Sequence, residues 1–175
     1  YRKEYKWSNI GAMLRNQRLD PRICTEDFDG RLVVITGATS GIGLVTAQKY
    51  ASHGAKILCI NRDERKSVEL CETLKNQYGA PCAYMIADFT KLADVHAVGR
   101  RLAALDEAID VLIHNAGVYL TQKTFTTDNL EMVFQTNYLS TYILNYYVKE
   151  KFIKQKKGRI LFVNSEAHRF AVWGL

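Results

Sequence analysis

The chain has 175 residues, of which 47% are hydrophobic and 24% charged, proportions that are ordinary for a soluble globular domain with one sizeable core. No uninterrupted apolar run approaches the roughly 18 residues that span a bilayer, so no transmembrane segment is expected. Much of the net charge of +6 comes from lysines crowded at the end of one predicted helix, and no known nucleic-acid-binding motif accompanies them, so nucleic-acid binding is not expected.

Residues 1–28 precede the first predicted strand and differ from the rest of the chain in pattern. Apolar side chains recur there at roughly helical spacing among arginines and lysines, at Trp7, Ile10, Met13 and Leu14. We expect an N-terminal extension, either a short helix that caps the domain or a partly ordered leader, and Pro21 is expected to end any helix. An amphipathic stretch of this kind is alternatively suited to rest on a membrane surface or a partner.

From Asp29 onward, apolar strand-like runs alternate with helix-like segments. The predicted pairs are 32–35 with 43–53, 56–60 with 64–78, 82–87 with 92–105 and 111–114 with 129–154, followed by a fifth strand at 159–164. This alternation predicts an α/β fold, a Rossmann-like, doubly wound parallel sheet with helices on both faces, in three α/β/α layers. Residues 29–175 are expected to form one domain, with the carboxyl ends of its strands at one edge of the sheet.

A glycine-rich turn links the first strand to the first helix, with the sequence Thr36-Gly37-Ala38-Thr39-Ser40-Gly41-Ile42-Gly43. A pyrophosphate can approach a backbone closely only where no Cβ intervenes, and the unpaired N–H groups at a helix N-terminus bind anions, aided by the helix dipole. The turn is therefore predicted to cradle the phosphates of a dinucleotide. The candidate cofactor contacts are Thr36, Gly37, Thr39, Ser40, Gly41, Ile42 and Gly43.

The spacing Gly-x3-Gly-x-Gly resembles the opening of the short-chain dehydrogenase/reductase family, and more of the family's landmarks follow in order over roughly residues 29–169. They are Asp88 after one strand-like run, Asn115-Ala116-Gly117 after another, Asn137 in the long helix-like stretch and Ser165 after the last strand. The segment from Ser165 to Phe170 is similar to that of the retinol-dehydrogenase and WW-domain-oxidoreductase branch. That similarity favours an apolar alcohol or carbonyl as the small-molecule substrate.

The end of the second strand indicates which cofactor is bound. Asn61 carries no charge, whereas Arg62 offers a planar fork of donors suited to a phosphate, with Arg65 and Lys66 close behind. NADP is therefore favoured over NAD as the cofactor. The alternative is that Arg62 is a solvated residue at a helix start and Asp63 an N-cap.

Two further segments are expected at the cofactor site. Asp88, with Phe89 beside it, is expected to cap the following helix or, as the resemblance implies, to accept a hydrogen bond from the adenine amino group. The backbone of Asn115-Ala116-Gly117 is expected to pass close to the cofactor, and the resemblance implies that Asn115 also ties the central strands together. His114 stands where the family commonly has Asn, and we expect a strand-end histidine satisfied by hydrogen bonds.

The resemblance implies hydride transfer between a nicotinamide and a carbinol or carbonyl carbon, with a tyrosine as the acid–base group and a lysine that lowers its pKa. It implies catalytic roles for Ser165, which would hydrogen-bond the substrate oxygen, and for Asn137, which would hold the lysine through a water. The family's Tyr-x3-Lys, expected beyond Ser165, is absent from the 175 residues. The same spacing at 119–123 and 147–151 precedes Ser165, and we interpret both matches as chance.

This absence leaves two explanations. In the one we favour, the catalytic tyrosine and lysine lie beyond Leu175 in a longer NADP(H)-dependent oxidoreductase. In the other, the chain is a catalytically inactive dinucleotide-binding sensor or interaction module.

The long helix-like stretch 129–154 also carries aromatic and aliphatic residues at helical spacing, at Phe134, Tyr138, Tyr142, Ile143 and Tyr146. Packing in the core is the first interpretation. The family commonly pairs this helix with its copy, so a homo-oligomer interface is the alternative for the outward side chains.

The cysteines show no Cys-x2-Cys pair, and the chain is large enough to need no disulfides. We expect buried thiols in a reducing compartment, a cytoplasmic protein and no metal site. The residues are Cys24, Cys59, Cys71 and Cys82.

Overall fold

The computed structural model describes residues 11, 14–15, 18–20 and 23–165. It divides into two compact units, one comprising Asp27–Val163 and the other Tyr1–Glu26 with Asn164–Leu175. Every strand and helix named below belongs to Asp27–Val163. Trp7, Ile10 and Met13 of the predicted N-terminal helix lie outside the described residues.

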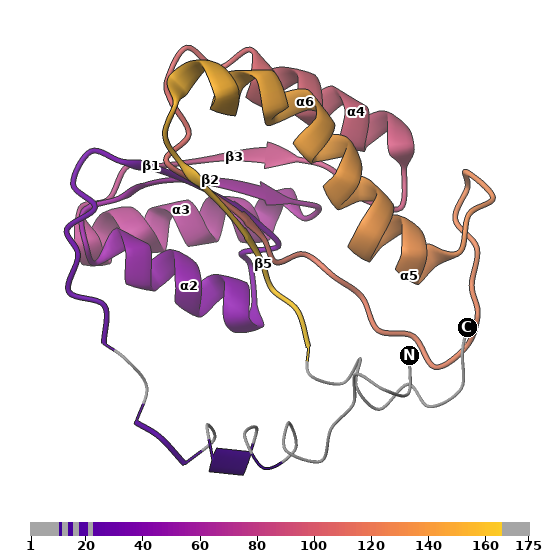
Figure 1. The fold of residues 1–175 in the computed structure, drawn as a ribbon, viewed down its shortest axis with the longest axis horizontal. Helices are drawn as coiled ribbons and strands as arrows, with labels where there is room; N and C mark the ends of the chain where they lie inside the picture. The colour runs from indigo at the N-terminus through magenta and orange to yellow at the C-terminus, as the bar shows by residue number, and fades with distance from the viewer. Residues whose placement is uncertain (1–10, 12–13, 16–17, 21–22, 166–175) are drawn as a thin grey trace. The chain divides into compact units, whose positions relative to one another are not determined.

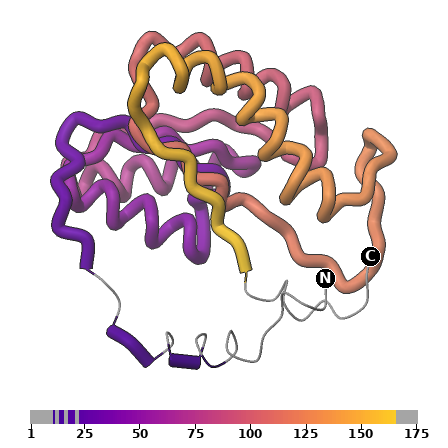
Figure 2. Tube along the Cα trace, viewed as in Figure 1, coloured from indigo at the N-terminus to yellow at the C-terminus, as the bar shows by residue number. Residues whose placement is uncertain are grey.

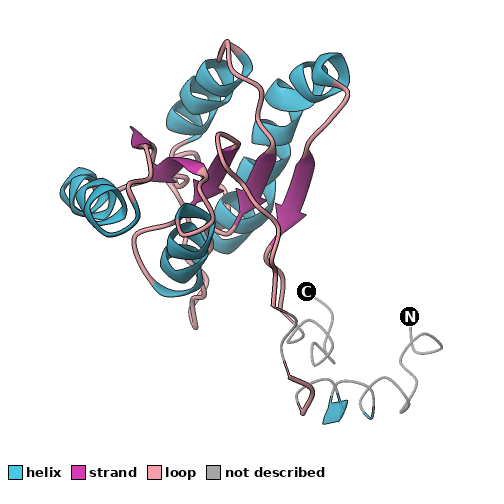
Figure 3. Ribbon diagram, turned by 90° about the vertical axis from the view of Figure 1, so that its left-hand side faces the viewer, coloured by secondary structure: helices cyan, strands magenta, loops and turns pink. Residues whose placement is uncertain are grey.

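The unit Asp27–Val163 contains one parallel sheet of five strands in the order β3-β2-β1-β4-β5. The strands are β1 (Leu32–Thr36), β2 (Lys56–Asn61), β3 (Cys82–Ile86), β4 (Val111–His114) and β5 (Arg159–Phe162). Helices lie on both faces of the strands (Figure 3). The predicted three-layer, doubly wound α/β fold is thereby confirmed.

The faces of the sheet are covered by different helices (Figure 1). Helices α2 (Gly41–Ala51) and α3 (Glu64–Tyr78) lie on one face, and α4 (Leu92–Ala103) and α6 (Ser140–Gln155) lie on the other. In β1, Val33 and Ile35 pack toward the first pair, whereas Leu32 and Val34 pack toward the second. Because both faces are covered, every residue of β1 is buried, which explains its continuous apolar run.

The predicted helix 129–154 begins later than expected and is not uniform. Asn129 adopts a left-handed conformation (φ 58°) in a turn closed by Thr126, so it cannot start a helix. The helix begins as α5 (Met132–Phe134), where the Glu131 carboxylate accepts hydrogen bonds from the Val133 and Phe134 N–H groups, which hold its pKa below the usual range. A π-helical turn, η1 (Gln135–Leu139), then leads into α6. Figure 2 follows the long connection from β4 to this helix.

The aromatic stripe of the long helix is not part of the core, contrary to the first interpretation. Phe134, Tyr138, Tyr142 and Tyr146 are all exposed, and Tyr146 is 71% exposed. The buried face of α6 is formed instead by Ser140, Leu144 and Val148, with Ile143 partly buried beside them. The tyrosines follow the same four-residue spacing but are offset around the helix, so they face outward.

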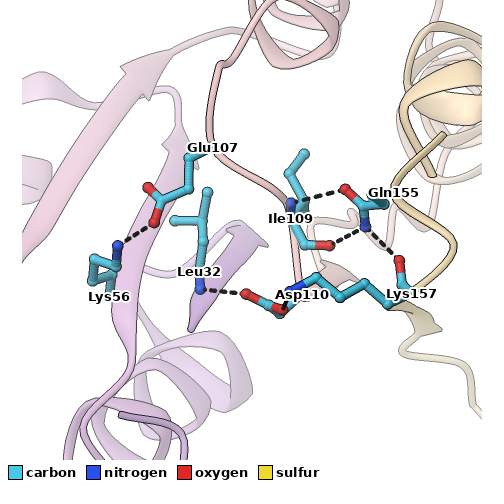
Figure 4. Close-up of polar contacts among 7 residues, drawn as sticks. All are labelled: Leu32, Lys56, Glu107, Ile109, Asp110, Gln155 and Lys157. Atoms are coloured by element: carbon cyan, nitrogen blue, oxygen red, sulfur yellow. Dashed lines mark hydrogen bonds and ion pairs between the residues drawn. The ribbon is translucent and has the colours of Figure 1, made fainter. Parts of the chain in front are cut away.

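The amino edge of the sheet is closed by side chains that bond to main-chain groups far away in sequence (Figure 4). The Asp110 carboxylate accepts a hydrogen bond from the Leu32 N–H (3.0 Å) and pairs with Lys157 (3.4 Å). The Gln155 amide bonds both the N–H (3.2 Å) and the carbonyl (2.7 Å) of Ile109. These contacts fix the end of α6 against the start of β4.

The cysteines are not uniformly buried. Cys59 is buried and Cys71 and Cys82 are partly buried, but Cys24 is exposed, so the expectation of a buried thiol is wrong at that position. Burial raises the pKa of the Cys71 thiol to about 12. Among the residues that the structure describes, no helix is long and apolar enough to span a membrane. A cytoplasmic location stays a prediction.

Candidate functional site

A crevice of about 360 Å³ opens at the carboxyl edge of the sheet. Its walls come from the segments that follow β1, β2, β3 and β4, together with one residue of η1. The lining residues are Gly37, Thr39, Ser40, Ile60, Asn61, Arg62, Asp63, Lys66, Ala87, Asp88, Phe89, Thr90, Asn115, Ala116, Gly117, Val118 and Thr136. Most of the predicted cofactor contacts therefore lie together; Thr36, Gly41, Ile42 and Gly43 are not in the lining.

The turn after β1 packs so tightly that two of its positions exclude any side chain. Gly37 has a φ of 69°, and a Cβ there would lie 2.9 Å from the Ala116 Cα. A Cβ at Gly43 would overlap the Gly37 carbonyl and lie 2.5 Å from the Asn115 amide nitrogen. These glycines bring the turn and the start of α2 directly against the loop after β4.

The N-terminus of α2 leaves backbone donors free. Ser40 is the N-cap residue, yet its side chain makes no capping hydrogen bond, and the first bond into this turn comes from Leu44 N–H to the Ser40 carbonyl. The N–H groups of the first turn therefore have no partner within the helix, and the helix dipole favours an anion there. The Ile42 side chain in this turn is exposed. This cradle fits the diphosphate of a dinucleotide.

Thr36 and Asn115 join β1 to β4 immediately behind the crevice. The buried Thr36 hydroxyl lies 3.4 Å from the Ile113 carbonyl and accepts hydrogen bonds from the N–H groups of Asn115 (3.0 Å) and Ala116 (2.9 Å). The Asn115 side-chain amide donates to the carbonyls of Thr36 (3.1 Å) and Gly37 (2.9 Å). Asn115 therefore ties the central strands together, as the family resemblance implies.

The residues at the end of β2 and just after it have two roles: some bond to the local backbone, and others carry positive charge. The Asn61 side chain is buried: its oxygen accepts a hydrogen bond from the Ala38 N–H (2.8 Å) and its nitrogen donates to the Ser67 hydroxyl (3.1 Å). Asp63 caps α3 by accepting from the Lys66 N–H (3.0 Å), so the N-cap interpretation of Asp63 is confirmed.

Two cations remain at this wall of the crevice. Arg62 and Lys66 both line it, whereas Arg65 pairs with Glu69 (2.7 Å) on the exposed side of α3. Lys66 was not among the cofactor contacts predicted from the sequence. It lies in the first turn of α3, close behind the N-cap Asp63, and so shares the wall of the crevice with Arg62.

In the loop after β3, nearly every backbone N–H group already donates to another protein group. The Asp88 N–H bonds the Asp94 carboxylate (3.0 Å), and Asp88 Oδ1 accepts from the N–H (3.0 Å) and hydroxyl (2.8 Å) of Thr90. Asp88 therefore does not cap α4, contrary to one expectation, because this local turn holds its carboxylate and the N-cap position belongs to Lys91. Among the described residues, neither the Phe89 N–H nor the second carboxylate oxygen of Asp88 has a hydrogen-bond partner.

Asn137, predicted to be catalytic, lies within η1, and π-helical turns occur frequently at functional sites. Its side-chain oxygen accepts a hydrogen bond from the Val118 N–H (2.8 Å), and its nitrogen donates to the Val118 carbonyl (2.9 Å). Ser165 belongs to the other compact unit, so its position relative to the crevice is not described. The chance matches to Tyr-x3-Lys have other partners: Tyr147 bonds His96 (3.0 Å), and Lys151 donates to the Leu105 carbonyl.

His114 ends β4 next to the crevice and is only half satisfied by hydrogen bonds. Its Nε2 lies 2.8 Å from the Asn145 side-chain oxygen, so Nε2 carries the proton and donates. Its buried Nδ1 has no partner among the described residues, and its ring stacks on Phe162 at 5.2 Å between centroids. Burial lowers the pKa of His114, because the charged form loses its hydration.

This burial predicts acid sensitivity. The folded-state pKa of His114 lies below the ordinary value of 6.5, so the unfolded chain binds the proton more readily, and the free energy of unfolding should fall as pH decreases below 6.5. Urea unfolding at pH 7.5 and 5.5 measures this fall in the free energy of unfolding. The fall should be smaller for His114→Asn than for the native protein, by at most about 1.4 kcal/mol per pH unit. His53→Asn, in the loop before β2, is the control. If both variants reduce the pH-dependent fall equally, the acid sensitivity does not come from His114.

Comparison with known proteins agrees with this geometry. The family model described as "short chain dehydrogenase" matches residues 31–174. WW domain-containing oxidoreductase from Homo sapiens is 33% identical over 145 residues, which cover 82% of this chain and 35% of that protein. Human retinol dehydrogenase 11 is 30% identical over 153 residues, covering 86% of this chain and 48% of that protein. The chain thus spans about a third to a half of the length of these relatives.

A solved structure of a short-chain dehydrogenase has a similar fold. The short-chain dehydrogenase from Sphingobium yanoikuyae in complex with NADPH aligns with a TM-score of 0.74 and 29% identity, over 82% of this chain and 57% of that one. The family match extends over nearly the whole unit that carries the glycine turn, the crevice and η1. The chain therefore belongs to the short-chain dehydrogenase/reductase family, in the branch of the retinol dehydrogenases and WW domain-containing oxidoreductase.

Proposed function

We propose that this oxidoreductase uses NADP(H) to interconvert an alcohol and a carbonyl by hydride transfer. The observation that carries the proposal is the pair of cations, Arg62 and Lys66, that line the crevice beside the glycine turn. The bound cofactor would supply or accept the hydride. The chain's own residues would bind and orient it.

The contacts of the crevice suggest how each part of NADP(H) would be held. The free N–H groups at the start of α2 would bind the diphosphate. The Phe89 N–H and the remaining Asp88 oxygen offer a donor beside an acceptor, the pattern that matches the N1 and amino group of adenine. The loop from Asn115 to Val118 would line the nicotinamide side.

The choice between NADP and NAD would be decided by the charged side chains that follow β2. Arg62 and Lys66 would bind the 2′-phosphate, while the Asp63 carboxylate, which also lines the crevice, is held by the Lys66 N–H at the start of α3. Among the described residues, no carboxylate forms an ion pair with Arg62 or Lys66. Their charges therefore remain available to an anion.

Replacing either cation should change cofactor preference. Arg62→Ala and Lys66→Ala should each weaken NADPH binding by about tenfold or more, as expected for the loss of a charged hydrogen bond, while NADH affinity changes little. Titration of full-length protein with both cofactors measures this, and Arg65→Ala, which removes a cation facing away from the crevice, is the control. If the substitutions weaken NADPH and NADH binding equally, the two residues do not bind the 2′-phosphate.

We propose that the acid–base tyrosine and lysine come from sequence that follows Leu175, because the family's Tyr-x3-Lys is expected beyond Ser165 and is absent from the 175 residues. The chain spans only about a third to a half of the length of the matched relatives, which leaves room for such a segment. Ser165 would hydrogen-bond the substrate oxygen, and Asn137 would hold the lysine through a water. The retinol-dehydrogenase-like branch supports an apolar alcohol or carbonyl as the substrate.

Activity of the full-length protein tests this assignment. NADPH-dependent reduction of apolar aldehydes and ketones should be detectable, and Ser165→Ala should lower kcat by about 100-fold or more while leaving NADPH affinity unchanged. Peptide mass spectrometry should find Tyr-x3-Lys after Leu175. If the full-length protein binds NADPH but lacks that segment and reduces nothing, the enzymatic assignment fails and a binding module remains.

The exposed tyrosines of the long helix support a homodimer as a further proposal. Tyr138, Tyr142 and Tyr146 form an outward aromatic face on η1 and α6, and side chains of this kind are enriched at interfaces. Light scattering should give the molar mass of a dimer for the full-length protein and of a monomer for Tyr146→Glu. Tyr119→Glu, at an exposed loop position, should remain a dimer. A monomeric native protein would refute this interface.

A further inference from the structure

We infer that Gln135 and Ser140 are positioning residues that tie the loop after β3 to Asn137, so that the adenine side of the crevice and the predicted catalytic position are held as one unit. This inference rests on the proposed function, because it assigns the loop after β3 to adenine. The evidence for it is a set of buried hydrogen bonds that play no part in the proposed binding of NADP(H).

Gln135 is fully buried, and both ends of its amide are engaged. Its oxygen accepts a hydrogen bond from the Thr126 hydroxyl (2.6 Å). Its nitrogen donates to the Phe89 carbonyl (3.2 Å) and to Asp128 Oδ2 (3.0 Å). A buried amide left without partners is costly, so these contacts fix the Gln135 side chain. One side chain thereby joins the loop after β3 to the first residue of η1.

Ser140 secures the other end of η1. Its N–H bonds the Gln135 carbonyl, the i to i+5 contact that defines a π-helical turn, and its hydroxyl lies 2.8 Å from the same oxygen. The hydroxyl also lies 3.2 Å from the Phe89 carbonyl. Ser140 therefore both reinforces the π-turn and attaches it to the loop after β3.

Asn137 is in the middle of the five residues that these contacts enclose. Because its side chain holds both main-chain groups of Val118, hydrogen bonds attach η1 and the adjoining Ser140 to Phe89 on one side and to the loop after β4 on the other. Both loops line the crevice, and β2 and β1 separate their strands, β3 and β4, in the sheet. Polar contacts between the walls resist their separation.

Phe89 gives this connection a direct link to binding. Its carbonyl accepts a hydrogen bond from the Gln135 amide and lies 3.2 Å from the Ser140 hydroxyl, whose single proton is shared with the Gln135 carbonyl, while its own N–H is the free donor proposed for adenine. Fixing the carbonyl orients the residue that presents the N–H. A base bound at Phe89 should in turn restrain η1 and Asn137, and with them the Val118 N–H.

Hydrogen exchange of the Val118 amide tests the connection in full-length protein. Saturation with adenosine 2′,5′-bisphosphate, which lacks the nicotinamide half, should slow exchange of this amide several-fold in the native protein. Ser140→Ala should weaken binding of the bisphosphate about fivefold to twentyfold and abolish the change in exchange at Val118. Thr126→Val is the matched control: it removes the hydroxyl that donates to Gln135 and accepts from the Asp128 and Leu130 N–H groups. It leaves the bond from the Gln135 nitrogen to the Phe89 carbonyl in place, so it should lower the melting temperature and leave both readouts intact.

The outcomes separate this inference from the proposed function. If the native protein binds the bisphosphate and exchange slows in the loop after β3 but not at Val118, the connection is refuted, and no variant is needed to show it. If Thr126→Val loses affinity and protection as Ser140→Ala does, the network is only structural and the inference is also overturned. If the native protein binds neither NADPH nor the bisphosphate, the proposed function fails and this inference fails with it.

Discussion

The crevice depends on how closely the turn after β1 approaches the loop after β4. That approach is possible because Gly37 and Gly43 lack side chains, and it is fixed by the hydrogen bonds between Thr36 and Asn115. β1 is hydrogen-bonded to β2 on one side and to β4 on the other, so the chain winds in opposite directions from this point. In open parallel sheets such a switch point is where loops diverge and leave room for a ligand.

The charge of the crevice depends on the aspartates and cations around it and on the groups that they contact. Asp63 is held at the N-terminus of α3, and Asp94 accepts the Asp88 N–H. Each of these carboxylates stabilises a local turn, and Asp63 also lines the crevice. Arg62 and Lys66 line the same wall, and among the described residues neither has an ion-pair partner. The proposed 2′-phosphate would meet these two cations.

The long helix holds the site from both of its ends. At its start, η1 carries Asn137 and contacts both crevice loops. At its end, Gln155 bonds both main-chain groups of Ile109, ahead of β4. Since β4 leads directly into the Asn115 loop, the same strand is fixed at its two termini by one helix. Sliding of the helix would break hydrogen bonds at both edges of the sheet, and these bonds therefore hold Asn137 in position.

The sequence by itself determined the alternating strands and helices, the glycine turn and the cation after β2, because hydrophobic periodicity, glycine and fixed charge act locally. Only the tertiary structure decided that Asp88 turns onto Thr90, that the tyrosines of α6 face outward and that the helix begins at Met132 with a π-turn. Those features depend on partners distant in sequence, as between Phe89 and Gln135, which are separated by 46 residues. A local pattern carries no information about which distant carbonyl a buried side chain will meet.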